Sequence, residues 1–79
     1  MQQIEFHLNR EFVQLNQLLK LTGLADSGGA GKALVADGGV LVDGVAELRK
    51  TCKIRIGQVV SFGEVQITVV AGAEEIPQA

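Results

Sequence analysis

Residues 38–44 read Gly-Gly-Val-Leu-Val-Asp-Gly, and β-prone residues continue on the far side, in residues 45–48. An Asp-Gly pair between two such runs is among the strongest local signals for a β-hairpin. A type I′ turn needs positive φ at both central residues, and Asp followed by Gly tolerates that conformation. The stretch therefore predicts an antiparallel hairpin that turns at Asp43 and Gly44.

The sequence before this hairpin predicts one strand and two helices. Residues 4–8 alternate apolar and polar side chains, as a half-buried strand does. From about Leu15 the apolar residues follow helical spacing, and Gly23 lies where a C-terminal cap belongs. A second short helix is predicted to begin at Ser27, a good N-cap, and to end at the glycines of residues 38–39. Its expected buried stripe consists of Ala30, Ala33 and Leu34.

The sequence after the hairpin predicts further short strands. Ile54 and Ile56 alternate with basic residues, and two apolar runs follow at residues 59–62 and 65–70. The expected core also includes the three phenylalanines, Phe6, Phe12 and Phe62. The predicted fold class is α+β, with two short helices packed on a small, mainly antiparallel sheet. We expect one domain over residues 1–71 and a flexible C-terminal tail over residues 72–79.

Composition limits the classes of function. The chain has 79 residues, enough for one domain, and no apolar run approaches the roughly 18 residues of a transmembrane helix. One cysteine and one histidine exclude an internal disulfide and a four-ligand zinc site within one chain. The first residues do not resemble a secretory signal, so a cytoplasmic location is expected.

Charge is distributed unevenly along the chain. The net charge is −2 and the sequence pI is about 5.2, whereas nucleic-acid-binding domains often have a pI above about 9. Residues 49–55, however, contain four basic side chains and no acidic one. Such a segment can neutralise phosphates, although an isolated run of this kind is more often a solvated loop.

Catalytic motifs are weak or absent. The Gly28–Lys32 stretch fails as a Walker A loop, because Asp26 stands at the first glycine position and Ala33 replaces the Ser or Thr. A catalytic role for the chain depends on His7 and Cys52 alone. Basic neighbours can lower the pKa of the Cys52 thiol, but a buried or merely tolerated cysteine is the more frequent case. No cofactor is therefore expected, and these two residues support an enzymatic function only weakly.

The order of these pieces resembles the S4 RNA-binding domain, and within it the small stand-alone bacterial YbcJ-like proteins. The resemblance covers roughly residues 4–70. It rests on residues 38–44, Gly57-Gln58-Val59-Val60, Leu18-Leu19-Lys20 with Gly23, Ser27-Gly28 with Lys32, and Glu47 with Arg49-Lys50 and Lys53. The sequence departs from the pattern at Leu41, at Gln58, and at Gly31, which is expected to loosen the helix that bears Lys32.

The resemblance implies an S4-like fold with an αL motif and a monomeric module that binds structured RNA, in particular ribosomal RNA, without a small-molecule substrate. In S4 domains the helical pair and the adjoining hairpin form one basic surface. Carried over by position, the expected contacts are Lys20, Ser27, Gly28, Lys32, Arg49, Lys50 and Lys53, and charge alone adds Arg55. The main alternative is a protein-interaction adaptor associated with the ribosome, which the negative net charge and Leu41 favour.

Overall fold

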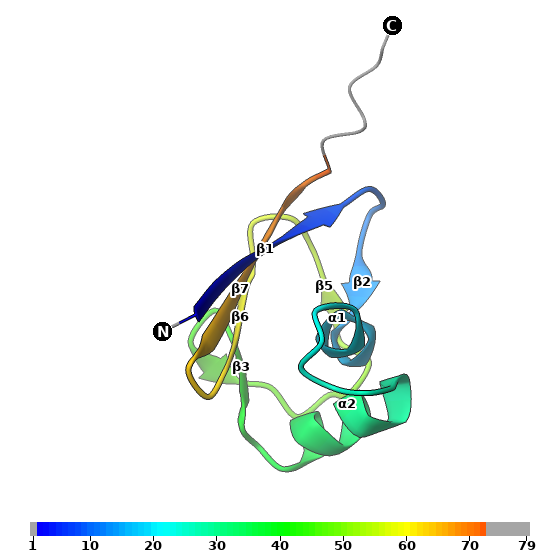
Figure 1. The fold of residues 1–79 in the computed structure, drawn as a ribbon, viewed down its shortest axis with the longest axis vertical. Coiled ribbons are helices and arrows are strands. Elements are labelled where there is room, and N and C mark those ends of the chain that lie inside the picture. Colours follow the sequence, from blue (N-terminus) through cyan, green and yellow to red (C-terminus); the bar gives the residue numbers. More distant parts are fainter. Residues whose placement is uncertain (1, 73–79) are drawn as a thin grey trace, which may run out of the picture.

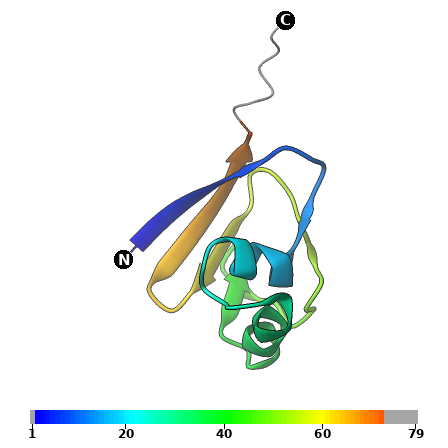
Figure 2. The ribbon, with the colours of Figure 1, turned by 45° about the vertical axis from the view of Figure 1, so that its right-hand side comes forward.

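The computed structural model describes residues 2–72 and consists of two layers (Figure 1). The elements are β1 (Gln2–Leu8), β2 (Val13–Gln14), α1 (Leu15–Leu21), α2 (Gly28–Ala36), β3 (Val40–Val42), β4 (Val45–Ala46), β5 (Lys53–Ile54), β6 (Val59–Phe62) and β7 (Val65–Ala71). A five-stranded sheet in the order β1-β7-β6-β3-β4 forms one layer. Both helices and the small β2-β5 sheet form the other, as the turned view in Figure 2 also shows. The predicted α+β class is confirmed.

The first and last strands of the sheet lie side by side. β1 and β7 pair in parallel, with Ile4 opposite Ile67, while the other strand pairs are antiparallel. Beyond β7, the backbone N–H of the buried Gly72 donates to the carbonyl of Leu8 at 3.0 Å. The first residue of the predicted tail is therefore bonded to the domain, and residues 73–79 lie outside the described residues.

The predicted hairpin is present and has the expected turn. Asp43 and Gly44 adopt φ values of 53° and 85°, as a type I′ turn requires. The Asp43 carboxylate accepts a hydrogen bond from the backbone N–H of Val59 at 2.9 Å, and the Asp43 N–H donates to the Val59 carbonyl at 2.7 Å. Asp43 thus forms the turn and also fixes β3 against the start of β6.

The predicted ends of the two helices are also confirmed. Gly23 has a φ of 84°, and the N–H groups of Gly23 and Leu24 donate to the carbonyls of Lys20 and Leu19. This is the Schellman arrangement that ends α1. At the start of α2 the Ser27 hydroxyl accepts from the N–H of Ala30 at 3.1 Å.

A continuous core joins the two layers. Leu15, Leu18 and Leu19 of α1 are fully buried against the inner face of the sheet, where Ile67 and Val69 are equally buried. The remaining buried apolar residues are Leu8, Val13, Ala25, Val35, Val40, Val42, Ile54 and Val60. No helix within residues 2–72 has the length and hydropathy needed to cross a bilayer.

The buried face of α2 differs from the prediction. Gly31 and Val35 are buried, Ala30 and Leu34 are half-buried, and Ala33 is exposed. The reason is the close contact between the two helices, because a Cβ atom on Gly31 would lie 2.5 Å from the backbone oxygen of Asn16. Gly31, one of the departures from the family pattern, therefore lets α2 pack closely on α1.

Ile56, predicted to belong to a short strand, and Phe12, predicted to lie in the core, are both found elsewhere. Ile56 is 51% exposed and follows β5, which ends at Ile54 because its partner β2 is only two residues long. Phe12 is half-buried outside the main core, beneath two basic side chains. The strand β2 itself was not predicted, since a polar segment precedes it.

Candidate nucleic-acid interface

The basic loop of residues 49–53 is held against the start of α1. The backbone N–H of Leu15 donates to the Cys52 carbonyl at 2.8 Å, and that of Asn16 donates to the Lys50 carbonyl at 3.1 Å. The first N–H groups of a helix have no partner within the helix, so this loop supplies acceptors that the helix needs. The loop is consequently a fixed part of the fold.

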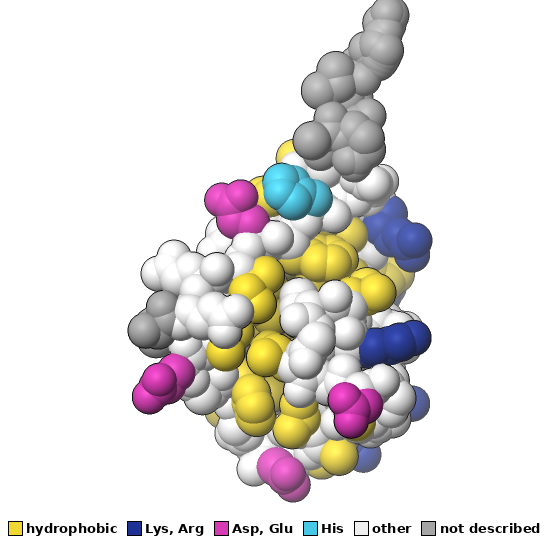
Figure 3. Space-filling view, in the orientation of Figure 1, with side chains coloured by type: hydrophobic (Ala, Val, Ile, Leu, Met, Phe, Trp, Pro, Cys, Tyr) yellow, Lys and Arg dark blue, Asp and Glu magenta, His cyan; other side chains and the backbone are white. Residues whose placement is uncertain are grey.

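Lys32 of α2 and the loop residues 49–53 line one shallow depression of about 570 Å³. The fold thus brings Lys32 to the predicted basic segment, although the two are far apart in the sequence. Lys32, Lys50 and Lys53 are all exposed, and none of them forms an ion pair within residues 2–72. Basic side chains gather along one edge of the molecule in Figure 3, while most acidic ones lie on the rest of the visible face.

Arg49 differs from these lysines because its charge is balanced. Its guanidinium donates to both carboxylate oxygens of Glu47, at 2.9 and 3.0 Å, and its backbone N–H donates to the same carboxylate at 2.9 Å. These hydrogen bonds lower the pKa of Glu47 to about 2, and they raise the pKa of Arg49. Arg49 therefore holds the loop in shape more than it adds free positive charge.

This pair predicts a specific titration. A carboxyl group with a depressed folded-state pKa contributes stability above its unfolded pKa and loses that contribution as the pH falls through the folded value. For Glu47 this stabilising contribution is lost as the pH falls from 4.5, its ordinary pKa, to about 2, its pKa in the folded protein. We expect the NMR titration of the Glu47 carboxyl carbon to have its midpoint near the lower value, and Arg49→Gln to raise it toward 4.5. A midpoint near 4.5 in the unaltered protein would show that the pair does not form.

A second group of basic residues surrounds Phe12. The Lys53 ammonium lies 4.8 Å from the ring centroid and the Arg55 guanidinium 5.8 Å from it, both within the range of cation–π contacts. Arg55 also pairs with Glu11 at 3.5 Å. Phe12 therefore orders the edge of the depression where Lys53 lies, and the charge of Arg55 is partly balanced.

The other residues predicted from the resemblance lie apart from the depression. Lys20 is exposed in the last turn of α1. The Ser27 hydroxyl caps α2, and the Gly28 carbonyl accepts from the buried Asn16 side chain at 3.3 Å. None of these three lines the depression formed by Lys32 and residues 49–53.

The two candidate catalytic residues lie on different parts of the fold, Cys52 in the basic loop and His7 on β1. Burial raises the pKa of the Cys52 thiol, and the neighbouring Glu47 carboxylate adds to this effect more than Arg49 opposes it. The suggestion of a lowered thiol pKa is therefore wrong. His7 is exposed on β1, with Nδ1 3.4 Å from the Ala71 carbonyl. Within residues 2–72 no three His, Cys, Asp or Glu side chains are grouped to hold a metal ion.

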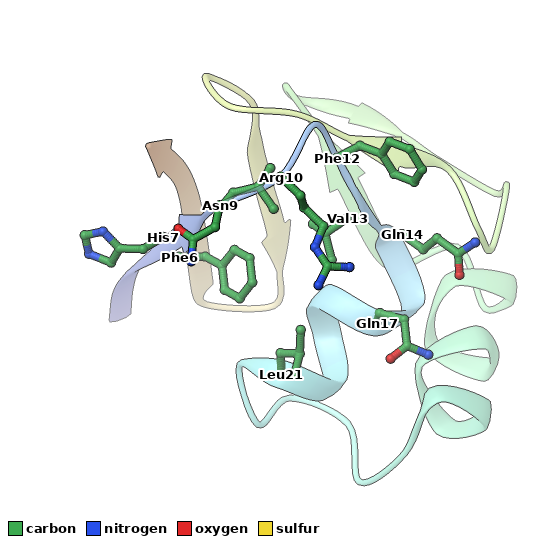
Figure 4. Close-up of a pocket in the computed structure, with 10 residues that line it drawn as sticks. Phe6, His7, Asn9, Arg10, Phe12, Val13, Gln14, Gln17 and Leu21 are labelled. Carbon is green, nitrogen blue, oxygen red and sulfur yellow. The ribbon is translucent and has the colours of Figure 1, made fainter. Parts of the chain in front are cut away.

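A second cavity, of about 490 Å³, lies between β1, the connection from β1 to β2, and α1 (Figure 4). Phe6 and Arg10 reach toward α1, and Leu21 points back from the helix, whereas His7 and Phe12 point outward. The residues that line it are Phe6, His7, Leu8, Asn9, Arg10, Phe12, Val13, Gln14, Gln17 and Leu21. Sequence reasoning missed this cavity, because its polar residues fall in a segment that looks like an ordinary strand-to-helix break.

Comparisons with known proteins agree with this architecture. The family model of the S4 domain matches residues 6–70. A protein of Escherichia coli (strain K12) named "Putative RNA-binding protein YbcJ" is 51% identical over 59 residues, which are 75% of this chain and 84% of that protein. The YbcJ protein of Shigella flexneri matches equally well. The solution structure of E. coli YbcJ, described as revealing an αL motif involved in RNA-binding, superimposes with a TM-score of 0.64 at 44% identity, covering 90% of this chain and 89% of the other.

Proposed function

Because the chain belongs to the S4 domain family, we propose that it is a non-catalytic RNA-binding module whose contact surface is the depression formed by Lys32 and residues 49–53. The observation that supports this most is the convergence of Lys32, Lys50 and Lys53 on one depression, without an acidic partner in the described residues. The RNA-binding description of the E. coli relative supports the same function.

The physical basis of the proposed binding is neutralisation of phosphates. Each lysine that contacts a phosphate releases condensed counterions, so the affinity falls as salt rises. The loop is already fixed by the hydrogen bonds from Leu15 and Asn16, so little backbone entropy is lost when RNA binds. Because the net charge is −2, attraction to RNA is confined to the basic part of the surface, and the rest of the molecule repels phosphates.

We further propose that the target is folded RNA, ribosomal RNA being the favoured source, and that the protein acts as a monomer in the cytoplasm. Proteins that bind extended single strands stack successive bases on exposed aromatic rings. Here Lys53 and Arg55 lie over Phe12, Phe62 packs against the core, and Phe6 is only half-buried, so the described residues present no row of exposed rings. Recognition of phosphates and of RNA shape fits this arrangement better than a run of stacked bases.

Salt dependence of binding tests the proposal. Three lysine–phosphate contacts give a log–log slope of about −2.7 for binding to a hairpin fragment of ribosomal RNA, measured by fluorescence anisotropy. Replacing one contacting lysine, Lys50→Gln, reduces the slope by about 0.9. The matched variant Gln3→Glu changes the net charge equally at an exposed site on β1 that neither lines the depression nor is a predicted contact, and leaves the slope unchanged. Absence of binding, or equal effects of the two variants, would contradict the proposed surface.

An adaptor that binds another protein is the second candidate. Val45 on the edge strand β4 is 69% exposed, Leu48 is 61% exposed, and Leu41 on β3 is half-buried. Leu41 and Val45 face opposite sides of the sheet, because Val45 is the register partner of Val42. An apolar contact at the β4 edge, through Val45 and Leu48, depends little on salt. Association with a ribosomal protein that persists at high salt, in the absence of any RNA affinity, would favour the adaptor over the RNA-binding module.

A further inference from the structure

We propose that the cavity between β1, the β1–β2 connection and α1 receives one unpaired nucleobase of the RNA whose phosphates lie on the depression at Lys32 and residues 49–53. This inference rests on the proposed function and adds to it a second, chemically different contact. The module is then expected to prefer folded RNA that contains one unpaired base, because such a base can leave its stack.

The lining of the cavity has the chemistry that a nucleobase requires. The Phe6 ring and the Arg10 guanidinium extend into the same space from β1 and the connection, and Leu21 extends into it from α1 (Figure 4). Unpaired bases in protein–RNA complexes stack on aromatic rings and on guanidinium planes. The side-chain amide of Asn9, which also lines the cavity, offers a donor and an acceptor to the edge of a base, whereas Gln14 and Gln17 extend away from the space between Phe6, Arg10 and Leu21.

The charge and size of the cavity agree with such a ligand. Arg10 forms no ion pair within the described part of the chain, so its guanidinium is available to a ligand there. The volume of about 490 Å³ falls within the roughly 300–1,000 Å³ typical of sites for small organic groups. A planar base can therefore enter the cavity without opening the fold.

The cavity is joined to the basic depression through β2 and β5. Gln14, which lines the cavity, is the register partner of Lys53, which lines the depression. Phe12, another lining residue, lies beneath the Lys53 ammonium at 4.8 Å. An RNA strand with phosphates at Lys53 can therefore continue past Phe12 to the cavity, where one of its bases can enter.

A pair of RNA hairpins tests this inference on the full chain. One hairpin has a fully paired stem, and the other has the same stem with a single unpaired adenine. We expect the unaltered protein to bind the bulged hairpin about tenfold more tightly, which is the typical contribution of one stacked base. A 2-aminopurine at the bulge should change its fluorescence on binding, since the base leaves one stack for another.

Three variants, one of them a control, separate this contact from the phosphate contacts. Leu21→Trp fills the cavity from a position that is 58% exposed, and it should abolish the preference while leaving affinity for the paired hairpin unchanged. Val45→Trp adds the same ring at a comparably exposed position that lines neither site, and it should keep the preference. Arg10→Gln should reduce the preference without adding bulk, and circular dichroism confirms folding of all three variants.

The outcomes distinguish this inference from the proposed function. Equal binding of the two hairpins by the unaltered protein would overturn the base contact and leave the RNA-binding surface intact. A preference lost equally in Leu21→Trp and Val45→Trp would also overturn it. Failure to bind either hairpin would instead contradict the proposed function itself.

Discussion

Replacing Lys32, Lys50 and Lys53 together by glutamate is expected to lower the affinity for a ribosomal RNA hairpin by at least about 100-fold at roughly 0.1 M salt. A slope of about −0.9 per phosphate contact means that each contact contributes nearly tenfold at this salt concentration, relative to 1 M. Three contacts therefore contribute several hundredfold, and repulsion between the new carboxylates and the phosphates adds to the loss. Fluorescence anisotropy or filter retention measures the change.

The matched control keeps the charge at the same three positions. Changing all three lysines to arginine should preserve most of the affinity and the salt slope, because guanidinium groups bind phosphates at least as well. All three side chains are exposed, so both variants should show the far-UV circular dichroism of the unaltered protein. RNA binding that survives the glutamate variant would remove this depression as the contact surface.

Gly31→Val is expected to destabilise the domain by about 2–3 kcal/mol, and so to lower its melting temperature by roughly 10–20 °C. The added Cβ would lie 2.5 Å from the Asn16 backbone oxygen, and a backbone atom of a buried helix cannot move aside as a flexible side chain does. Helices α1 and α2 must separate, which weakens the contacts of the fully buried Val35. Thermal and urea unfolding followed by circular dichroism measure this loss.

Gly29→Ala in the same helix is the control. A Cβ at Gly29 has only the Ser27 hydroxyl oxygen nearby, at 3.9 Å, so the substitution meets no obstacle. Alanine is favoured over glycine in a helix, and a gain of roughly 0.5–1 kcal/mol is expected. If Gly31→Val and Gly29→Ala had the same stability, the two helices would not be in the close contact described.

The parts of the fold that sequence predicts well are those that depend on neighbouring residues. Asp43 and Gly44 determine their own turn, Gly23 ends α1, and Ser27 begins α2, each through hydrogen bonds within a few residues. The buried face of α2 depends instead on Asn16 in the other helix. Glycine has no side chain that a hydrophobic pattern can register. The pattern therefore predicted that Ala33 is buried, whereas the structure buries Gly31.

In the candidate site, too, the features set by neighbouring residues are predictable from sequence, and those set by distant residues are not. The basic segment is visible in the sequence, and the family resemblance brings in Lys32, which the structure places beside it. The balance of Arg49 by Glu47 depends on the exact shape of the loop, and charge counting alone cannot reveal it. The cavity at Arg10 depends on how three separate segments pack, and no single segment contains a sign of it.

The parallel pairing of β1 with β7 has a consequence for biosynthesis. β1 is at the edge of the sheet, with β7 as its single neighbour, and each of its residues pairs with one more than sixty positions later in the chain. During synthesis of residues 2–71, β1 is made before the other strands of the sheet and β7 after them, so this pair cannot form until the whole segment has left the ribosome. Closing so long a loop also makes this pairing a slow step of folding. The strand β1, which carries Ile4 and Phe6, thus has no strand partner until Ala71 has left the exit tunnel.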